Sequence, residues 1–171
     1  MIVIISTCKE KLSELEFVEP LKKIVGNCIV VSYKKIDEKE ILKADKIIIS
    51  GTCLKDFDYL NCDFGWLKTY AKPVLGICAG MQIIAKEFGA RLIDCASFGI
   101  KKVETICDNK ICKGNFSAYF LHTKNAAEGF EILATANNRP VVIKHGEKEI
   151  YGCIFHPEVL NTEIIKNFVL L

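Results

Sequence analysis

The chain has 171 residues, half of them hydrophobic and 26% charged, which is enough to bury one sizeable core and predicts a single domain over residues 1–171. The net charge of +2 comes from 23 basic and 21 acidic residues with no basic stripe among aromatics, which argues against a nucleic-acid surface. No apolar run approaches the roughly 20 residues that cross a bilayer, and "MIVIISTCKE" resembles a first strand more than a signal peptide, so we expect no membrane association and a cytoplasmic location.

The first half of the chain alternates short apolar runs with amphipathic segments. The runs are rich in Ile and Val and cover residues 2–6, 28–33, 46–51 and 73–77, with helical segments expected in 16–26, 39–45 and 62–70. Strands that are apolar on both faces and separated by helices are typical of a parallel sheet that is covered on both sides. Some of the gaps hold barely ten residues, so we expect the connecting helices to be short.

The second half contains mostly strands. After a helix over residues 79–88 that ends at Gly89, strands are predicted for 89–94, 100–106, 117–122, 130–135, 140–145 and 149–155. The stretch "KHGEKE" is expected to form a turn, with His145 as an exposed turn residue, and Asn161 or Thr162 to cap a closing helix. We predict an α/β fold, a three-layer sandwich whose central sheet is open, mixed and mostly parallel, with antiparallel strands at one edge.

The cysteines are not spaced as in a disulfide framework or a zinc site. There are nine of them, an odd number, and no CxxC pair occurs. This spacing fits neither a disulfide framework nor a zinc site, so we expect reduced thiols, a reducing compartment and no bound metal.

Cys78 is the candidate nucleophile. In "PVLGICAGMQ" it stands where the strand at 73–77 passes into the helix, with Gly76 and Gly80 on either side. Small residues at these positions allow the sharp turn of a nucleophile elbow. A helix N-terminus stabilises negative charge and lowers the pKa of a thiol. The alternative is a buried structural cysteine, because free cysteine is often buried.

A thiol nucleophile needs a base, and His156 in "FHPEV" follows the last predicted strand. If the chain is extended there, Glu158 points to the same side as His156 and can orient its ring, with Pro157 stiffening the link. The competing interpretation is a strand-to-helix turn with an exposed glutamate.

Together these motifs resemble a known family. "GICAGMQ" followed by "FHPE" is similar to the class I glutamine amidotransferases, and residues 122–159 resemble the glutaminase domain of GMP synthetase most. The resemblance implies a flavodoxin-like sheet and hydrolysis of glutamine to glutamate and ammonia through a Cys78 thioester, with His156 as acid and base and Glu158 as its orienting group. It also implies delivery of the ammonia to a separate ATP-dependent synthetase, with no cofactor on this chain, because 171 residues leave no room for that second domain.

The resemblance further implies where the substrate is held. The oxyanion is expected against backbone N–H groups of Ala79 and of the loop containing Gly51 and Thr52, and Gln82 matches a glutamine-contacting position. The backbone of Leu121, His122 and Thr123 is expected to hold the amino-acid end of the substrate. His122 can equally be a packing residue.

Three places depart from the family pattern. Thr52-Cys53 stands where the family has Gly-Pro, and Lys124 stands where GMP synthetases have an acidic residue, while Met81 replaces a histidine of that subfamily. Two other functions therefore stay open, a γ-glutamyl hydrolase or peptidase using the same residues and a non-catalytic regulatory module.

Overall fold

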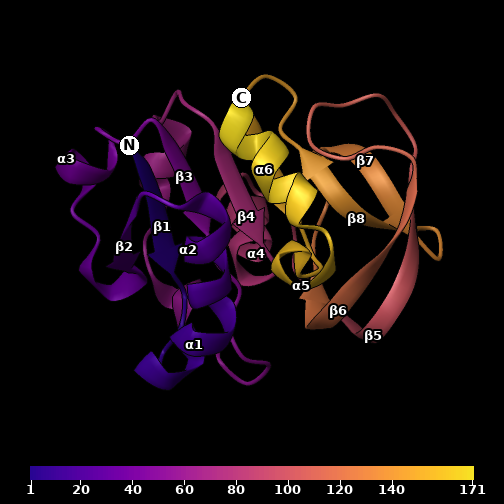
Figure 1. The fold of residues 1–171 in the computed structure, drawn as a ribbon, viewed down its shortest axis with the longest axis horizontal. Helices are drawn as coiled ribbons and strands as arrows, with labels where there is room; N and C mark the ends of the chain where they lie inside the picture. Colours follow the sequence, from indigo (N-terminus) through magenta and orange to yellow (C-terminus); the bar gives the residue numbers. More distant parts are fainter.

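The computed structural model describes all residues 1–171 and contains one nine-stranded mixed sheet with helices on both faces (Figure 1). The strands are β1 (Ile2–Ser6), β2 (Cys28–Ser32), β3 (Lys46–Ile49), β4 (Val74–Ile77), β5 (Ile93–Thr105), β6 (Asn115–Asn125), β7 (Glu131–Ala136), β8 (Arg139–Lys144) and β9 (Ile150–Cys153). The helices are α1 (Glu14–Phe17), α2 (Glu19–Val25), α3 (Glu38–Ile41), α4 (Ala79–Glu87), α5 (Pro157–Leu160) and α6 (Thr162–Leu170). Short 3-10 turns cover Lys11–Ser13, Tyr33–Lys35, Asp58–Asn61 and Gly65–Lys68.

Five strands form the parallel part of the sheet, in the order β2-β1-β3-β4-β9. The residues of β4 and β9 are buried throughout, whereas the edge strand β2 is partly exposed. Alternate side chains of β1 and β3 enter two different cores, because successive residues of a strand point to opposite faces. The four parallel strands expected in the first half are confirmed to within two residues at each end, but β9, from the second half, was not expected to be parallel and pairs parallel with β4.

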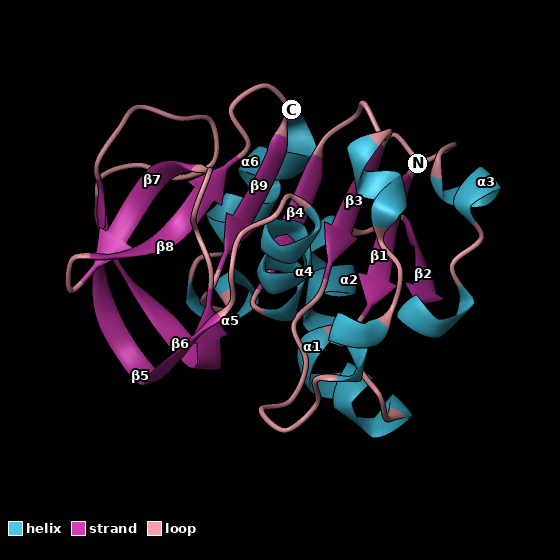
Figure 2. Cartoon of the chain, turned by 180° about the vertical axis from the view of Figure 1, so that it is seen from behind, coloured by secondary structure: helices cyan, strands magenta, loops and turns pink.

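The two cores make the three layers of the predicted sandwich. On one face Ile4 and Ile48 pack with Leu21 of α2 and Phe168 of α6. On the other face the core contains residues of β1, β3, α4 and the 62–70 segment: Val3, Ile5, Ile47, Ile49, Ile84, Trp66 and Tyr70. Figure 2 shows α4 covering the sheet on the side opposite α2 and α6. None of the helices is long and apolar enough to cross a membrane.

The remaining four strands continue from β9 through antiparallel pairs, in the order β9-β8-β7-β5-β6, and extend the sheet to one end of the molecule (Figure 1). The prediction of separate strands at 89–94 and 100–106 is wrong, because β5 is one strand of 13 residues. A register shift between Asp94 and Ser97 and a positive φ of 79° at Gly99 interrupt its apolar pattern. Its pairing with β6 continues past both irregularities, so the strand bends without ending.

Two turns show how local sequence shapes the antiparallel part. Asn137 and Asn138 have φ values of 51° and 58° between β7 and β8, as in a two-residue type I′ hairpin, where asparagine is favoured. His145 lies in the predicted turn but is half-buried, and its Nδ1 accepts hydrogen bonds from the N–H groups of Glu147 and Lys148. It therefore stabilises the turn rather than facing solvent freely.

The closing helix starts at the predicted place without the predicted capping bond. Asn161 is the residue before α6, but its side chain makes no capping hydrogen bond. Its Nδ2 instead donates to the carbonyl oxygen of Ser117 at 3.1 Å. The amide is used to fasten α6 to β6, a long-range contact that a local capping rule does not anticipate.

The connection from β4 to α4 depends on two glycines. A Cβ on Gly76 would lie 2.5 Å from the carbonyl carbon of Gly80, and a Cβ on Gly80 would lie 2.2 Å from the carbonyl oxygen of Ile49. Both distances are far below van der Waals contact, and the opposing atoms are backbone. The absence of side chains therefore allows α4 to pack directly against β3 and β4.

Gly80→Ala should destabilise the fold by about 1–3 kcal/mol or more, because the added methyl group overlaps backbone that cannot rotate away. Chemical denaturation measures the free energy of unfolding. Gly146→Ala is the matched control, since the nearest atom to its Cβ would be the Glu131 Oε1 at 3.8 Å. Equal stability of the two variants would contradict the packing argument.

Candidate active site

Cys78 occupies a strained turn at the carboxyl end of β4. Its φ of 48° and ψ of −98° lie in a region that residues with a Cβ rarely adopt. The conformation is held by hydrogen bonds from the Cys78 N–H to the Cys153 carbonyl at 2.8 Å and from the Gln82 N–H to the Cys78 carbonyl at 3.1 Å. Its Sγ lies 3.6 Å from the Leu121 carbonyl oxygen of β6. Neighbouring strands therefore fix the thiol at the start of α4, as the elbow motif predicts.

His156 and Glu158 form a buried pair beside this turn. The His156 Nδ1 is 2.9 Å from the Glu158 Oε1, and each side chain is only 1% exposed. The His156 N–H donates to the Tyr119 carbonyl, and the ring packs on Phe17 with centroids 5.4 Å apart. Pro157 and Glu158 begin α5 instead of continuing an extended chain, and Glu158 is not an exposed turn residue. The extended-chain prediction is wrong; the alternative is right about a strand-to-helix turn and wrong about an exposed glutamate.

Gly51 brings the histidine and the cysteine together. A Cβ on Gly51 would lie 2.6 Å from the His156 Cε1 and 3.5 Å from the Cys78 Cβ, so its backbone packs against both side chains. The His156 Nε2, the ring nitrogen opposite the one bound to Glu158, is buried and has no hydrogen-bond partner. This nitrogen is available for a proton transfer.

The electrostatics of the site favour a charged imidazole. Burial acts to lower the pKa of His156, but the interactions of its ring with Cys78 and then with Glu158 outweigh it. The pKa of His156 is therefore raised well above its ordinary value. A thiolate next to an imidazolium is the reactive form of a cysteine nucleophile.

The loop after β3 holds Thr52 without the positive φ that glycine would permit there. Thr52 is buried and does not have a positive φ. Its Oγ1 donates to the Asp56 Oδ2 at 3.1 Å, and the same carboxylate oxygen accepts the Lys9 N–H at 2.6 Å. Its own N–H makes no hydrogen bond within the chain. The threonine thus holds the loop to Asp56 while leaving its amide free.

Gln82 is held by contacts that the sequence did not indicate. Its Oε1 accepts a hydrogen bond from the Tyr59 hydroxyl at 2.7 Å, and its Nε2 donates to the Lys124 carbonyl at 3.1 Å. Burial raises the pKa of Tyr59, which keeps its hydroxyl a donor. Thr7 was also missed, although its hydroxyl donates to the Ser50 or Gly51 carbonyl, each at 3.0 Å. The only sequence signal for Thr7 is its position directly after β1, and Asp56 lies in the longer loop that follows β3.

A small hollow joins most of the expected substrate-binding residues. It is lined by Thr52, Cys53, Leu54, Asp56, Phe57, Tyr59, Cys78, Ala79, Gln82, Leu121, His122 and Thr123. Gly51, His156 and Glu158 lie outside this lining. Its volume is about 10 Å³, the space of about one water molecule. In this conformation the hollow is therefore too small to hold a substrate of amino-acid size.

Lys124 helps to keep this hollow closed. Its Nζ lies 5.6 Å from the centre of the Phe57 ring and 2.7 Å from the Asp94 Oδ1. The lysine thus links β6 and β5 to the covering loop through a cation–π contact and an ion pair. This residue is one of the departures from the family pattern, and its side chain lies at the edge of the hollow instead of binding within it.

His122 is buried at the back of the hollow. It is 3% exposed, its Nδ1 has no hydrogen-bond partner, and burial lowers its pKa to about 4.

No group of three or more side chains suited to a metal ion gathers anywhere in the chain.

Comparison with known proteins identifies relatives. Residues 17–170 match the family model described as glutamine amidotransferase class-I. The chain is 33% identical over 156 residues to a glutamine-hydrolyzing GMP synthase subunit of Pyrococcus furiosus, covering 82% of each chain, and 40% identical over 167 residues to the corresponding subunit of Methanococcus aeolicus, covering 90% of this chain and 86% of that one. A crystal structure of a Thermoplasma acidophilum protein described as a GMP synthase subunit shares the fold with a TM-score of 0.83 at 23% identity, covering 98% of this chain and 91% of that one.

Glu158→Gln should lower the pKa of His156 towards the ordinary value of about 6.5, because it removes a negative charge and weakens the charged hydrogen bond. Nuclear magnetic resonance of labelled histidine, recorded as a function of pH, follows this titration. Glu163→Gln, at an exposed position in the first turn of α6, is the control and should leave it unchanged. An unchanged His156 titration in Glu158→Gln would contradict the assigned pairing.

Proposed function

The chain belongs to the class I glutamine amidotransferase family, and we propose that residues 1–171 act as one domain that hydrolyses glutamine to glutamate and ammonia through a Cys78 thioester. The observation that carries this proposal is the strained turn at Cys78, which lies beside the buried pair of His156 and Glu158. The His156 Nδ1 and the Glu158 Oε1 of this pair are 2.9 Å apart. A buried cysteine needs neither a positive φ nor an imidazole next to it. An adjacent imidazole is what activates a thiol nucleophile, and the strained turn is typical of a nucleophile elbow.

In the first half-reaction the Cys78 thiolate attacks the side-chain amide carbon of glutamine, forming a C–S bond and a tetrahedral oxyanion. The His156 imidazolium then gives its Nε2 proton to the amide nitrogen, the C–N bond breaks, and ammonia leaves. Glu158 holds the ring through Nδ1, so that Nε2 is the nitrogen that exchanges protons. The raised pKa of His156 supports its role as the acid of this step.

In the second half-reaction His156, now neutral, removes a proton from water, and the resulting hydroxide attacks the thioester carbon. The C–S bond breaks, glutamate leaves, and the thiolate is restored beside an imidazolium. The proton given to ammonia is thus replaced by one from water, and the cycle closes without a redox step, a metal or an organic cofactor on this chain.

The oxyanion of both half-reactions would be bound by backbone N–H groups. Ala79 is the first residue of α4, where helix geometry leaves the N–H without an intrahelical partner. Thr52 supplies the second donor in this proposal, supported by its free N–H and by the position of Gly51 against Cys78 and His156. The α-amino and carboxylate groups of glutamine would lie along Leu121, His122 and Thr123, with Gln82 at the base of the hollow.

The ammonia would pass to a separate ATP-dependent synthetase. The similar proteins from Pyrococcus furiosus and Methanococcus aeolicus carry the name of a glutamine-hydrolyzing GMP synthase subunit, and this supports a GMP synthetase as the partner. The nine thiols, spaced without a disulfide framework, support the reducing cytoplasm as the compartment. No feature of the structure favours the γ-glutamyl hydrolase or the regulatory module over the glutaminase.

Cys78→Ala should lower ammonia release from glutamine by at least about a thousandfold, because no other thiol can take its place at the turn. A coupled glutamate dehydrogenase assay, run with and without the partner synthetase, measures this. Cys107→Ala, which changes an exposed cysteine outside the hollow, should retain the activity. Activity in Cys78→Ala, or turnover of γ-glutamyl peptides in preference to glutamine, would sink the proposal.

Lys124→Gln should lower the KM for glutamine about two- to fivefold, with little change in kcat, because it removes the cation–π contact and the ion pair that hold the closed loop. The backbone carbonyl that binds Gln82 stays in place. Lys110→Gln removes a different surface ion pair, with Glu149, and serves as the control in steady-state kinetics. Identical KM values for all three proteins would show that the Lys124 contacts do not limit substrate entry.

A further inference from the structure

A second cavity lies on the other side of His122 from the glutamine hollow. Its volume is about 350 Å³, and its polar lining comes from β5, β6 and the β7–β8 hairpin: Ser97, Lys101, His122, Asn125, Asn137 and Arg139. Phe120 and Val141 are among its apolar residues. The volume falls in the range of small-molecule sites, whereas the glutamine hollow in this conformation is much smaller.

The charges around this cavity are all of one sign. Lys101 and Arg139 line it, no aspartate or glutamate does, and neither cation takes part in a salt bridge anywhere in the structure. The Arg139 Nη1 lies 2.9 Å from the Cys95 Sγ, a contact that anchors the guanidinium at the wall. Arg139 is an exposed residue, and its other N–H groups have no acceptor within the chain, so at the mouth of the cavity they offer donors and positive charge to an anion.

His122 adds a buried polar group to the same wall. Its side chain is 3% exposed and its Nδ1 has no partner within the protein. A buried ring nitrogen without a partner is costly unless a ligand or water completes its hydrogen bonding. The irregularity of β5 lies at this wall of the cavity. The register shift between Asp94 and Ser97 contains Cys95, and directly after it Ser97 pairs with His122.

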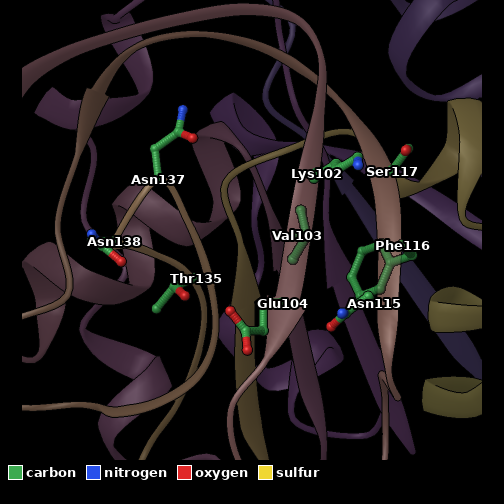
Figure 3. A pocket seen from close by; sticks show the side chains of 9 residues that line it. All are labelled: Lys102, Val103, Glu104, Asn115, Phe116, Ser117, Thr135, Asn137 and Asn138. Carbon is green, nitrogen blue, oxygen red and sulfur yellow. The ribbon is translucent and has the colours of Figure 1, made fainter.

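A larger hollow nearby provides a contrast. It has a volume of about 640 Å³ and is lined by Lys102, Val103, Glu104, Asn115, Phe116, Ser117, Thr135, Asn137 and Asn138 (Figure 3). Its one cation, Lys102, shares the lining with the carboxylate of Glu104, so the charges balance. Lys101 and Lys102 are successive residues of β5 and face different cavities, as alternation along a strand requires.

We propose that the cavity between β5, β6 and the β7–β8 hairpin binds a small phosphate monoester, with Lys101 and Arg139 holding the phosphate group. A phosphate dianion neutralises both cations, and the planar guanidinium donates to two of its oxygens. The volume exceeds what inorganic phosphate fills, which leaves room for the organic part against Phe120 and Val141. The ligand would contact His122, which also lines the glutamine hollow.

Isothermal titration calorimetry of the whole chain, without glutamine, tests this with ribose 5-phosphate, inorganic phosphate and ribose. Ribose 5-phosphate should bind more tightly than inorganic phosphate, and ribose should not bind. Arg139→Gln and Lys101→Gln should each weaken binding by about tenfold or more, whereas Lys102→Gln should leave it unchanged. Thermal unfolding of each variant establishes that it is folded. If one of the two cavity variants fails to fold, the other still tests the proposal.

Two results would overturn the proposal. One is the absence of ribose 5-phosphate binding to the folded wild-type chain. The other is equal weakening by Lys102→Gln and by the two cavity variants, which would mean attraction to general positive charge. A binding measurement in the absence of glutamine is independent of Cys78, so its failure and a failure of the glutaminase proposal are distinguishable.

Discussion

The close approach of α4 to β3 and β4 is the constraint on which the rest of the site depends. Gly76 and Gly80 leave no room for a Cβ, and the chain between them must turn so sharply that Cys78 takes a φ of 48°. A residue in this conformation costs of order 1–3 kcal/mol, and it persists only when its surroundings over-determine it. Hydrogen bonds to β9 and to the first turn of α4 do so here, and the thiol is thereby placed at a helix start.

Burial then determines the chemistry available to that thiol. His156 and Glu158 are removed from water, where an uncompensated charge would be expensive, so the pair is stable only with both members present. The same burial leaves the His156 Nε2 without a partner and makes it available for proton exchange. The hollow beside Gln82 and Tyr59 has a volume of only about 10 Å³, so the side chains that line it must move before a glutamine molecule fits.

Much of this arrangement could be predicted from the sequence because it depends on local patterns. Runs of Ile and Val indicated the parallel strands, and glycines around Cys78 indicated the turn. Contacts between segments far apart in the chain could not be predicted in this way. Tyr59 reaches Gln82, Asp56 reaches Lys9, and Asn161 reaches Ser117, each through a loop geometry that has no periodic signal. The continuous β5 and the two unpaired cations beside it were missed for the same reason, because pairing with β6 overrides an irregular apolar pattern.

The central claim is that Cys78 is a nucleophile activated by His156 and Glu158. Its most direct test is to mix the chain and its synthetase with glutamine, quench with acid within the first turnovers, and measure the mass of the intact chain and of its peptides. The account predicts a mass increase of one glutamyl group on the peptide containing Cys78, absent from Cys78→Ala and released on longer incubation. Turnover of glutamine with an unmodified Cys78 under conditions that trap thioesters, or a glutamyl group on another cysteine, would contradict it.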